Sequence, residues 1–273
     1  MARILALSSW VAHGHVGLSA AVPALQALGH EVTPLPMTIL SNHPGWPHVA
    51  GAPLPCDQLG AMIEALDRNG WLAGVEAVLT GYMPTPDHVD LAAALIRRLC
   101  RSRPVPRVIV DPVLGDLPKG LYVPVAVAEA VRDRLVPLAD TLTPNAFELG
   151  WLTGEAVGTL EAVQVAAAGL FPSAPAQTVL VTSAPAPEGW IGTLSVSRHA
   201  ALSWATPRRN GVPNGVGDVL SGLIAAGLPA GAALGHLSTL IEASLGAPHL
   251  RIVESASDWT RAAPLHPQSL PEI

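Results

Sequence analysis

The sequence predicts an α/β fold with a mostly parallel sheet that is covered by helices on both faces. Three observations lead to this prediction. Short apolar runs that suit strands alternate along the chain with longer amphipathic runs that suit helices. The strand-like runs are apolar throughout, as expected of strands buried on both faces. Two neighbouring runs, 190–196 and 200–204, look like an antiparallel pair, which gives the sheet an antiparallel edge.

The remaining elements follow from the same alternation. The strands are predicted at residues 3–8, 31–40, 76–80, 107–111, 141–142 and 178–182. The helices are predicted at residues 16–28, 57–69, 87–101 and 123–135, and from about residues 145, 216 and 230. Gly29 is expected to end the first helix, and Asp87 is expected to cap the third. In such a sheet, ligands bind beyond the carboxyl ends of the strands, so polar residues there are the candidates for function.

The composition limits the possible classes of protein. With 273 residues, the chain is long enough for one domain over 1–273 with a large core. Charged residues make up 13%, about half of the usual ~25%, which excludes a disordered or coiled-coil protein. The net charge is −6, and no run of basic residues is longer than two, so we expect no nucleic-acid partner.

Nothing in the sequence indicates export or a membrane. Cys56 and Cys100 have no metal-ligand spacing and fit a reduced, cytoplasmic setting. The apolar run at residues 4–7 is too short for a signal peptide. The uncharged stretch that begins at Val219 is broken by Pro229 and several glycines, so it predicts two core helices and no membrane span.

The clearest chemical motif is Gly215-Val216-Gly217-Asp218, which directly precedes an apolar helical run. Glycines at a helix start allow backbone N–H groups to converge on an anion, and the helix dipole adds to this. Asp218, in the first turn, suits a base that takes a proton from a nucleophile attacking a phosphoryl group. The alternative is a simple glycine-rich turn. Because the chain has no Walker A loop and no GxGxxG fingerprint, a P-loop kinase and a Rossmann dehydrogenase are disfavoured.

Two further segments combine acidic and polar residues after predicted strands. Asp111 and Asp116 are spaced so that they can hold a hydrated cation, or they are turn and N-cap acids. Lys119, the one lysine of the chain, follows in a Pro/Gly-rich stretch that suits a mobile flap reaching a phosphate, or it is a solvated loop residue. Asn145 and Glu148 form a capping-box pattern and also suit a metal near a triphosphate.

Weaker signals lie at other strand ends. Thr182 and Ser183 place hydroxyls at the end of a predicted strand, and Tyr82 follows another. Histidines cluster near the N-terminus at His13, His15, His43 and His48, but without the HExxH motif or the carboxylate spacing of a zinc site.

Taken in order, these pieces resemble the pyridoxal kinase family of the ribokinase-like superfamily over nearly the whole chain. The matching blocks are Ser9 with 14–17 (GHVG), 41–43 (SNH), 80–82 (TGY), 111–116 (DPVLGD), 143–145 (TPN) with Glu148, 181–183 (VTS) and 215–218 (GVGD). The last block is shared by the superfamily, and the N-terminal blocks point to the pyridoxal branch. The resemblance implies a three-layer α/β/α fold and ATP-dependent phosphorylation of the 5′-hydroxymethyl group of pyridoxal. It also implies Mg-ATP, activation by potassium and a homodimer.

The resemblance also implies roles for individual residues. Asp218 matches the catalytic base, and the backbone of Gly215, Val216 and Gly217 matches the anion hole. Residues that match the pyridine pocket are Ser9, Val16, His43 and Tyr82. Residues that match nucleotide-phosphate and metal positions are Asp111, Asn145, Glu148, Thr182 and Ser183, with Lys119 on the flap. Residues that match the surroundings of the monovalent cation are Asp116, Thr143 and Glu148.

The chain departs from the family pattern near the substrate. Leu18 and Pro44 stand where Asn and Thr are frequent, and Trp46 replaces a common Tyr. We expect these residues to touch the vitamer side of the pocket. They keep two alternatives open: a hydroxymethylpyrimidine kinase or other small-alcohol kinase of the superfamily, and a vitamer-binding protein without catalysis. The short, Pro-rich segment 184–188 carries no recognisable base-binding pattern.

Overall fold

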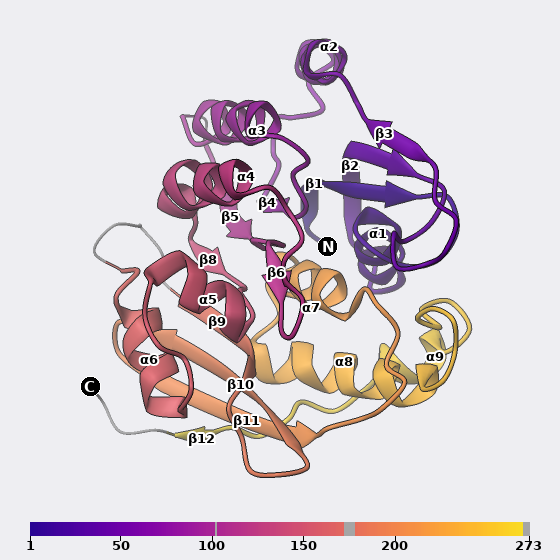
Figure 1. Ribbon diagram of the computed structural model, residues 1–273. Coiled ribbons are helices and arrows are strands. Elements are labelled where there is room, and N and C mark those ends of the chain that lie inside the picture. Colours follow the sequence, from indigo (N-terminus) through magenta and orange to yellow (C-terminus); the bar gives the residue numbers. More distant parts are fainter. Residues whose placement is uncertain (102, 172–177, 270–273) are drawn as a thin grey trace.

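The computed structural model describes residues 1–101, 103–171 and 178–269. Within these ranges the main sheet has ten strands in the order β12-β11-β10-β9-β8-β5-β4-β1-β2-β3 (Figure 1). The six consecutive strands from β9 to β2 are all parallel. The strands at both ends pair antiparallel. The predicted parallel sheet with an antiparallel edge is therefore confirmed.

The parallel strands lie where the apolar runs predict them. They are β1 (Arg3–Val11), β2 (Glu31–Leu40), β4 (Ala77–Thr80), β5 (Arg107–Val110), β8 (Thr141–Leu142) and β9 (Thr178–Ala184). The antiparallel strands are β3 (Gly51–Pro53), β10 (Trp190–Ser197), β11 (Ala201–Pro207) and β12 (Gln268–Ser269). A separate hairpin joins β6 (Gly115–Asp116) to β7 (Gly120–Leu121). The short strands β3, β6, β7 and β12 were not predicted, because two or three residues carry no readable periodicity.

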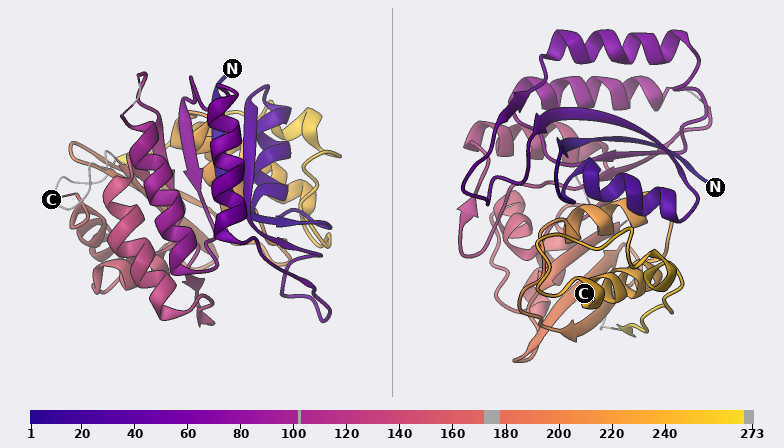
Figure 2. Two further views of the ribbon diagram at one scale, coloured as in Figure 1. Left: turned by 90° about the horizontal axis from the view of Figure 1, so that it is seen from above. Right: turned by 90° about the vertical axis from the view of Figure 1, so that its right-hand side faces the viewer.

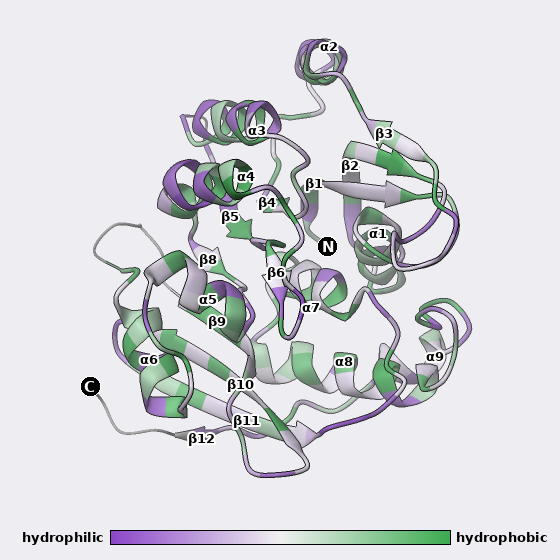
Figure 3. Cartoon of the chain, in the orientation of Figure 1, coloured by the Kyte–Doolittle hydropathy of each residue, from purple (hydrophilic) through white to green (hydrophobic). Residues whose placement is uncertain are grey.

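Helices cover both faces of the sheet, so the fold has three layers (Figure 2). One face carries α2 (Cys56–Arg68), α3 (Pro86–Leu99), α4 (Val125–Ala130) with a π-helical turn (Val131–Leu135) and a 3-10 turn (Val136–Leu138), α5 (Ala146–Thr153) and α6 (Leu160–Ala168). The other face carries α1 (Leu18–Ala27), α7 (Val216–Ala225), α8 (Ala230–Ser244) and α9 (Ala256–Trp259). Each face encloses its own cluster of buried apolar residues. The central strands are hydrophobic, as Figure 3 shows for β4 and β5.

Local capping differs from the prediction in one place. Helix α3 is capped by Thr85, whose side chain accepts a hydrogen bond from the His88 N–H, with Pro86 at the first helical position. Asp87 instead lies in the first turn, so its predicted N-cap role is wrong. Threonine followed by proline is a good helix start, and an acid in the first turn still favours the helix dipole. Gly29 follows the end of α1 with a φ of +80°, as predicted.

The sheet brings distant segments of the chain to one edge. Because β1, β4, β5, β8 and β9 run parallel, their carboxyl ends meet there. The polar segments that follow these strands are thus neighbours, although they are far apart in the sequence. No helix in the described ranges is both long enough and apolar enough to cross a membrane.

Candidate active site

The glycine-rich segment before α7 lies against the loop after β1. Gly215 is the N-cap of α7 with a φ of +99°, a conformation that favours glycine. A Cβ at Gly215 would overlap the carbonyl oxygen of His15, so only glycine allows this close approach. A Cβ at Gly217, in contrast, would meet open space. The start of α7 therefore fits tightly on the β1–α1 loop and stays open on the side of Gly217.

Asp218 lies in the first turn of α7 and is only partly exposed. Burial raises the pKa of its carboxyl to about 6. Hydrogen bonds from the backbone N–H groups of Gly17 and of Asp218 itself lower this pKa and offset part of the effect of burial. A carboxyl with this pKa is largely ionised at neutral pH and is a better proton acceptor than an exposed aspartate. The Gly17 contact also ties Asp218 to the loop that lines the neighbouring cavity.

Further carboxylates share this neighbourhood. Asp111, at the end of β5, is buried, and its pKa lies well above the ordinary range because of burial and the nearby charges of Glu148 and Asp218. A hydrogen bond from Ser221 on α7 acts in the opposite direction. The hydroxyl of Tyr122, after β7, lies near the same acids: burial, Glu148, Asp111, Asp116 and Asp218 all raise the pKa of Tyr122. Sequence reasoning did not identify Tyr122 as a site residue, because a tyrosine after a Pro/Gly-rich stretch gives no signal by itself.

Asn145 and Glu148 form the predicted capping box at the start of α5. Glu148 also accepts a hydrogen bond from the Leu114 N–H at 2.7 Å, and Asn145 donates to the Gly115 carbonyl at 2.8 Å. Burial raises the pKa of Glu148, while these backbone donors lower it. The two side chains thus fix the segment that carries Asp111 and Asp116 to α5. The capping alternative is confirmed, and a role near a cation stays a prediction.

The other predicted phosphate and metal residues also lie at this edge. Thr143 is buried, and its hydroxyl has no hydrogen-bond partner. Thr182 and Ser183 lie on β9 next to the Asn145 bridge, and Ser183 adopts a φ of +53°. Lys119 is exposed in the turn between β6 and β7, and Figure 3 shows that this hairpin carries hydrophilic residues. Burial and, to a smaller extent, the charge of Lys119 lower the pKa of His43. Because His43 lines the cavity described next, the β6–β7 hairpin lies near that cavity.

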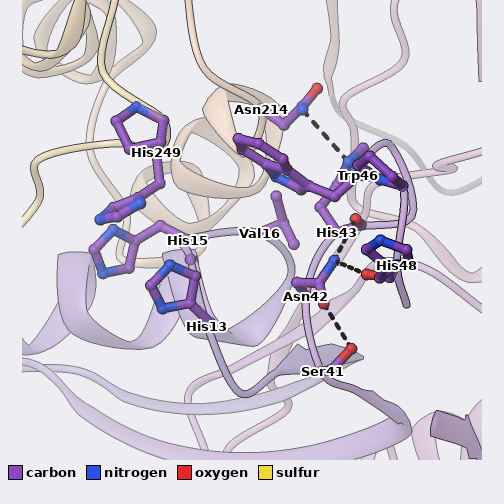
Figure 4. A pocket seen from close by; sticks show the side chains of 13 residues that line it. His13, His15, Val16, Ser41, Asn42, His43, Trp46, His48, Asn214 and His249 are labelled. Atoms are coloured by element: carbon purple, nitrogen blue, oxygen red, sulfur yellow. Dashed lines mark hydrogen bonds between the residues drawn. The ribbon is translucent and has the colours of Figure 1, made fainter. Parts of the chain in front are cut away.

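A cavity of about 530 Å³ opens beside the β1–α1 loop (Figure 4). Val16 and His43, both predicted for the pyridine pocket, line it. The other lining residues are His13, Gly14, His15, Ser41, Asn42, Trp46, Pro47, His48, Asn214, Pro248 and His249. Asn214 lies within 3.4 Å of the His43 ring and directly precedes Gly215, so the cavity adjoins the start of α7. Its size suits a small heteroaromatic ring.

Several pocket predictions have a different outcome. Ser9 and Tyr82 do not line this cavity: the Ser9 hydroxyl packs against Gly17, and the Tyr82 N–H donates to the Ser8 hydroxyl at 3.0 Å. Leu18, the first residue of α1, is fully buried in the core and does not line the cavity. The expectation that it touches the vitamer side of the pocket is therefore wrong. Trp46 lines the cavity, as its predicted contact with the vitamer side requires, and Pro44 is exposed outside the lining.

Proteins of similar sequence show the family to which this chain belongs. The model of the phosphomethylpyrimidine kinase family matches residues 51–237. A pyridoxal kinase PdxY of Leifsonia xyli is 39% identical over 230 residues, which cover 82% of this chain and 80% of that protein. The chain belongs to the pyridoxal kinase family. A pyridoxine/pyridoxal/pyridoxamine kinase of Bordetella avium from this family is 38% identical and covers 85% of this chain and 79% of its own length.

Solved structures of the pyridoxal kinase family share the whole fold. The pyridoxal kinase of Leishmania donovani in complex with ADP and pyridoxamine superimposes with a TM-score of 0.90 at 28% identity. The match covers 99% of this chain and 100% of that chain. The pyridoxal kinase of Entamoeba histolytica gives a TM-score of 0.90 at 25% identity over 99% of this chain and 100% of its own. The ribokinase-like fold and the family resemblance are thereby confirmed.

Proposed function

We propose that this enzyme transfers the terminal phosphoryl group of ATP to the 5′-hydroxymethyl group of pyridoxal, forming pyridoxal 5′-phosphate. The observation that carries the proposal is the position of Asp218. Its carboxyl lies at the glycine-lined start of α7, bound by the Gly17 N–H, next to a cavity of the right size for a pyridine ring. The solved relative from Leishmania donovani holds ADP and pyridoxamine together, which is the pair of ligands this reaction requires.

The residues at the start of α7 supply the chemistry. Asp218 accepts the hydroxyl proton as the oxygen attacks, and its pKa of about 6 keeps it ionised at neutral pH. The backbone N–H groups of Gly215, Val216 and Gly217 stabilise the negative charge of the transferring group, and open space beside Gly217 leaves room for it. The tight contact between Gly215 and His15 fixes the loop relative to the substrate, so alignment supplies much of the rate.

The residues at the neighbouring strand ends fit Mg²⁺ and a monovalent cation. Asp111 and Glu148 offer carboxylates close to each other, and the buried Thr143 hydroxyl has no partner, as expected of an oxygen reserved for a cation. Within the described ranges, no three His, Cys, Asp or Glu residues form a metal site by themselves. Kinases bind Mg²⁺ through one or two carboxylates together with substrate phosphates, and Asp111 and Glu148 would supply such carboxylates here. When bound, Mg²⁺ neutralises phosphate charge.

We assign the remaining roles in the same proposal. Asp111, Asn145, Glu148, Thr182 and Ser183 contact the nucleotide phosphates and their Mg²⁺, with Lys119 on the hairpin above them. Asp116, Thr143 and Glu148 surround the potassium ion. Val16 and His43 contact the pyridine ring from the cavity wall, and we assign Ser9 and Tyr82, which lie outside that lining, to the same substrate site. The chain acts as one kinase domain over 1–273, as a homodimer in the cytoplasm.

A second candidate substrate is hydroxymethylpyrimidine, since the matching family model is that of phosphomethylpyrimidine kinases. Purified enzyme with Mg-ATP is tested side by side on pyridoxal, pyridoxine and hydroxymethylpyrimidine, with ADP release as the readout. We expect the highest kcat/KM for a B6 vitamer. Turnover of the pyrimidine alone would replace the first proposal by the second. Binding of pyridoxal without any turnover would indicate a vitamer-binding protein.

A further inference from the structure

The loop between β2 and β3, residues 41–50, lines the cavity and is held together by its own hydrogen bonds. The side chain of Asn42 donates to the carbonyls of His43 and His48 at 3.1 and 3.0 Å. Asn42 also accepts a hydrogen bond from the Ser41 hydroxyl at 2.6 Å. The loop is therefore a single hydrogen-bonded unit, although most of its residues are exposed.

One side-chain contact joins the outer part of this loop to the rest of the protein. Within the described ranges, residues 42–49 make a single hydrogen bond outside the loop, from the Asn214 side chain to Nδ1 of His43 at 3.4 Å (Figure 4). Asn214 also lines the cavity, and it directly precedes Gly215. The contact therefore links the β2–β3 loop to the start of α7.

Two donors reach the same nitrogen of the His43 ring. The Gly45 N–H lies 3.0 Å from Nδ1, so this nitrogen must carry a lone pair. The Asn214 side chain must then present its NH₂ group to Nδ1, because its oxygen cannot donate. Neutral His43 accordingly carries its proton on Nε2, which has no hydrogen-bond partner among the described residues. Burial and the charge of Lys119 lower the pKa of His43, so the neutral ring is favoured.

The position of Asn214 is fixed by the residue that follows it. Gly215 packs so closely against the His15 carbonyl that a Cβ would overlap it. Asp218 lies four residues after Asn214, in the first turn of α7. The base and the Asn214 side chain thus belong to one short segment that is held against the β1–α1 loop. The Asn214 contact therefore sets where the His43 ring lies relative to the base.

We propose that Asn214 is a positioning residue for the phosphoryl transfer: it holds the His43 ring, and with it the β2–β3 loop, at a fixed distance from the start of α7. Its contact also leaves Nε2–H as the group of this ring that can donate to a substrate oxygen or nitrogen. The inference rests on the proposed function for the contact between His43 and the substrate. A hydrogen bond of ordinary net strength corresponds to about a two- to tenfold change in an equilibrium constant.

The first measurement is steady-state turnover at about pH 8, where the Asp218 carboxyl is ionised and histidine is neutral. Asn214→Ala removes the contact and should lower kcat/KM for pyridoxal about two- to tenfold, with the KM for ATP unchanged. Asn214→Asp keeps the size of the side chain but removes the donor, and it should lose at least as much. The matched control is Asn210→Asp, in the same exposed segment but outside the cavity lining, which should behave as the wild type. Wild-type kcat/KM in Asn214→Ala overturns the proposal.

The second measurement is a double-variant cycle with His43→Ala. Because Asn214 acts through the His43 ring, Asn214→Ala should have no further effect on kcat/KM when His43 is already alanine. An equal loss in both backgrounds overturns the proposal, since Asn214 would then act by another route.

A third measurement needs no turnover. Nitrogen-15 spectra of the histidine-labelled protein report which ring nitrogen of His43 carries the proton, and the signal is assigned by its loss in His43→Ala. We expect the proton on Nε2. A proton on Nδ1 overturns the proposal, because that nitrogen could not then accept from Asn214.

The wild-type enzyme separates this proposal from the proposed function. If it phosphorylates hydroxymethylpyrimidine and not pyridoxal, the proposed function fails, and the same cycle on the pyrimidine decides the role of Asn214. If it phosphorylates neither, both fail.

Discussion

Replacing Asp218 by asparagine should slow phosphoryl transfer and stabilise the fold at the same time. Burial raises the pKa of the carboxyl from 3.8 to about 6, so its ionised form is disfavoured in the folded state by about 3 kcal/mol. Because folding raises this pKa, the contribution of Asp218 to stability is full below the unfolded-state pKa and is lost as the pH rises through about 6. Asparagine resembles the protonated carboxyl and still accepts the Gly17 N–H.

The expected result has a sign that depends on pH. At neutral pH and above, Asp218→Asn should raise the free energy of unfolding by up to about 3 kcal/mol. Near pH 4, the difference should vanish. Loss of the base should lower kcat about 10²- to 10⁴-fold. In the wild type, kcat/KM should fall below about pH 6 as Asp218 is protonated.

Urea unfolding followed by circular dichroism across this pH range gives the stability, and ADP release gives the rate. The exposed Asp258→Asn is the matched control, with an expected change within about 0.5 kcal/mol. If Asp218→Asn is less stable than the wild type at every pH, the burial argument is wrong. If its kcat falls less than about tenfold, Asp218 is not the base.

Three further pairs of variants test neighbouring contacts. Gly215→Ala should unfold at lower urea concentration, because its Cβ would overlap the His15 carbonyl, whereas Gly217→Ala should keep its stability and lose turnover; equal stability of the two would contradict the loop geometry. Asn145→Ala and Thr159→Ala each remove a helix N-cap and should each cost about 1 kcal/mol of unfolding free energy. Only Asn145→Ala should raise the KM for ATP, and a similar rise in Thr159→Ala would remove Asn145 from the site. Ser8→Ala leaves the Tyr82 N–H without its hydrogen-bond acceptor and should lower the free energy of unfolding by about 1–3 kcal/mol. Ser9→Ala should mainly raise the KM for pyridoxal. The reverse pattern, measured by the same assays, would exchange the two roles.

The sequence predicted the parts of the fold that depend on periodicity. β2 spans residues 31–40 as predicted, and the strands at 76–80, 107–111 and 178–182 differ from the structure by only a few residues. Fully apolar runs and glycine-rich helix starts are local signals that tertiary contacts do not change here. Helices α6 and α9 were missed. Helix α9 has only four residues, and α6 is rich in alanine and carries only a weak contrast between its faces.

The parts of the candidate site that lie in short sequence motifs were predictable. Asp218, Asp111 and Glu148 come from three such motifs, and the parallel sheet brings them together. The cavity was less accessible to sequence reasoning. His249 and Asn214 line it together with His15, but they come from the far end of the chain, and a lone histidine or asparagine in a loop carries no signal. Leu18, in contrast, was predicted at the pocket because it directly follows the GHVG motif, but its side chain is buried in the core.

Departures from ordinary backbone and side-chain rules concentrate at the same edge of the sheet. In the described ranges, the non-glycine residues with positive φ are Val113, at +49°, and Ser183, at +53°. Such conformations cost about 1–3 kcal/mol each and persist where the surrounding structure fixes them. Val113 lies two residues after Asp111, Ser183 lies near the end of β9, and the unpartnered hydroxyl of Thr143 lies at the strand end between them.

These costs have a common physical meaning. A protein under selection for stability alone would replace the buried Asp111 carboxyl, give the Thr143 hydroxyl a partner and place glycine at residue 113. The chain keeps all three unfavourable features within one set of strand ends, beside the acid at the start of α7. Local rules fail together where a structure positions groups for a ligand. These unfavourable features favour a ligand site at the carboxyl ends of β5, β8 and β9, on grounds that do not depend on any relative.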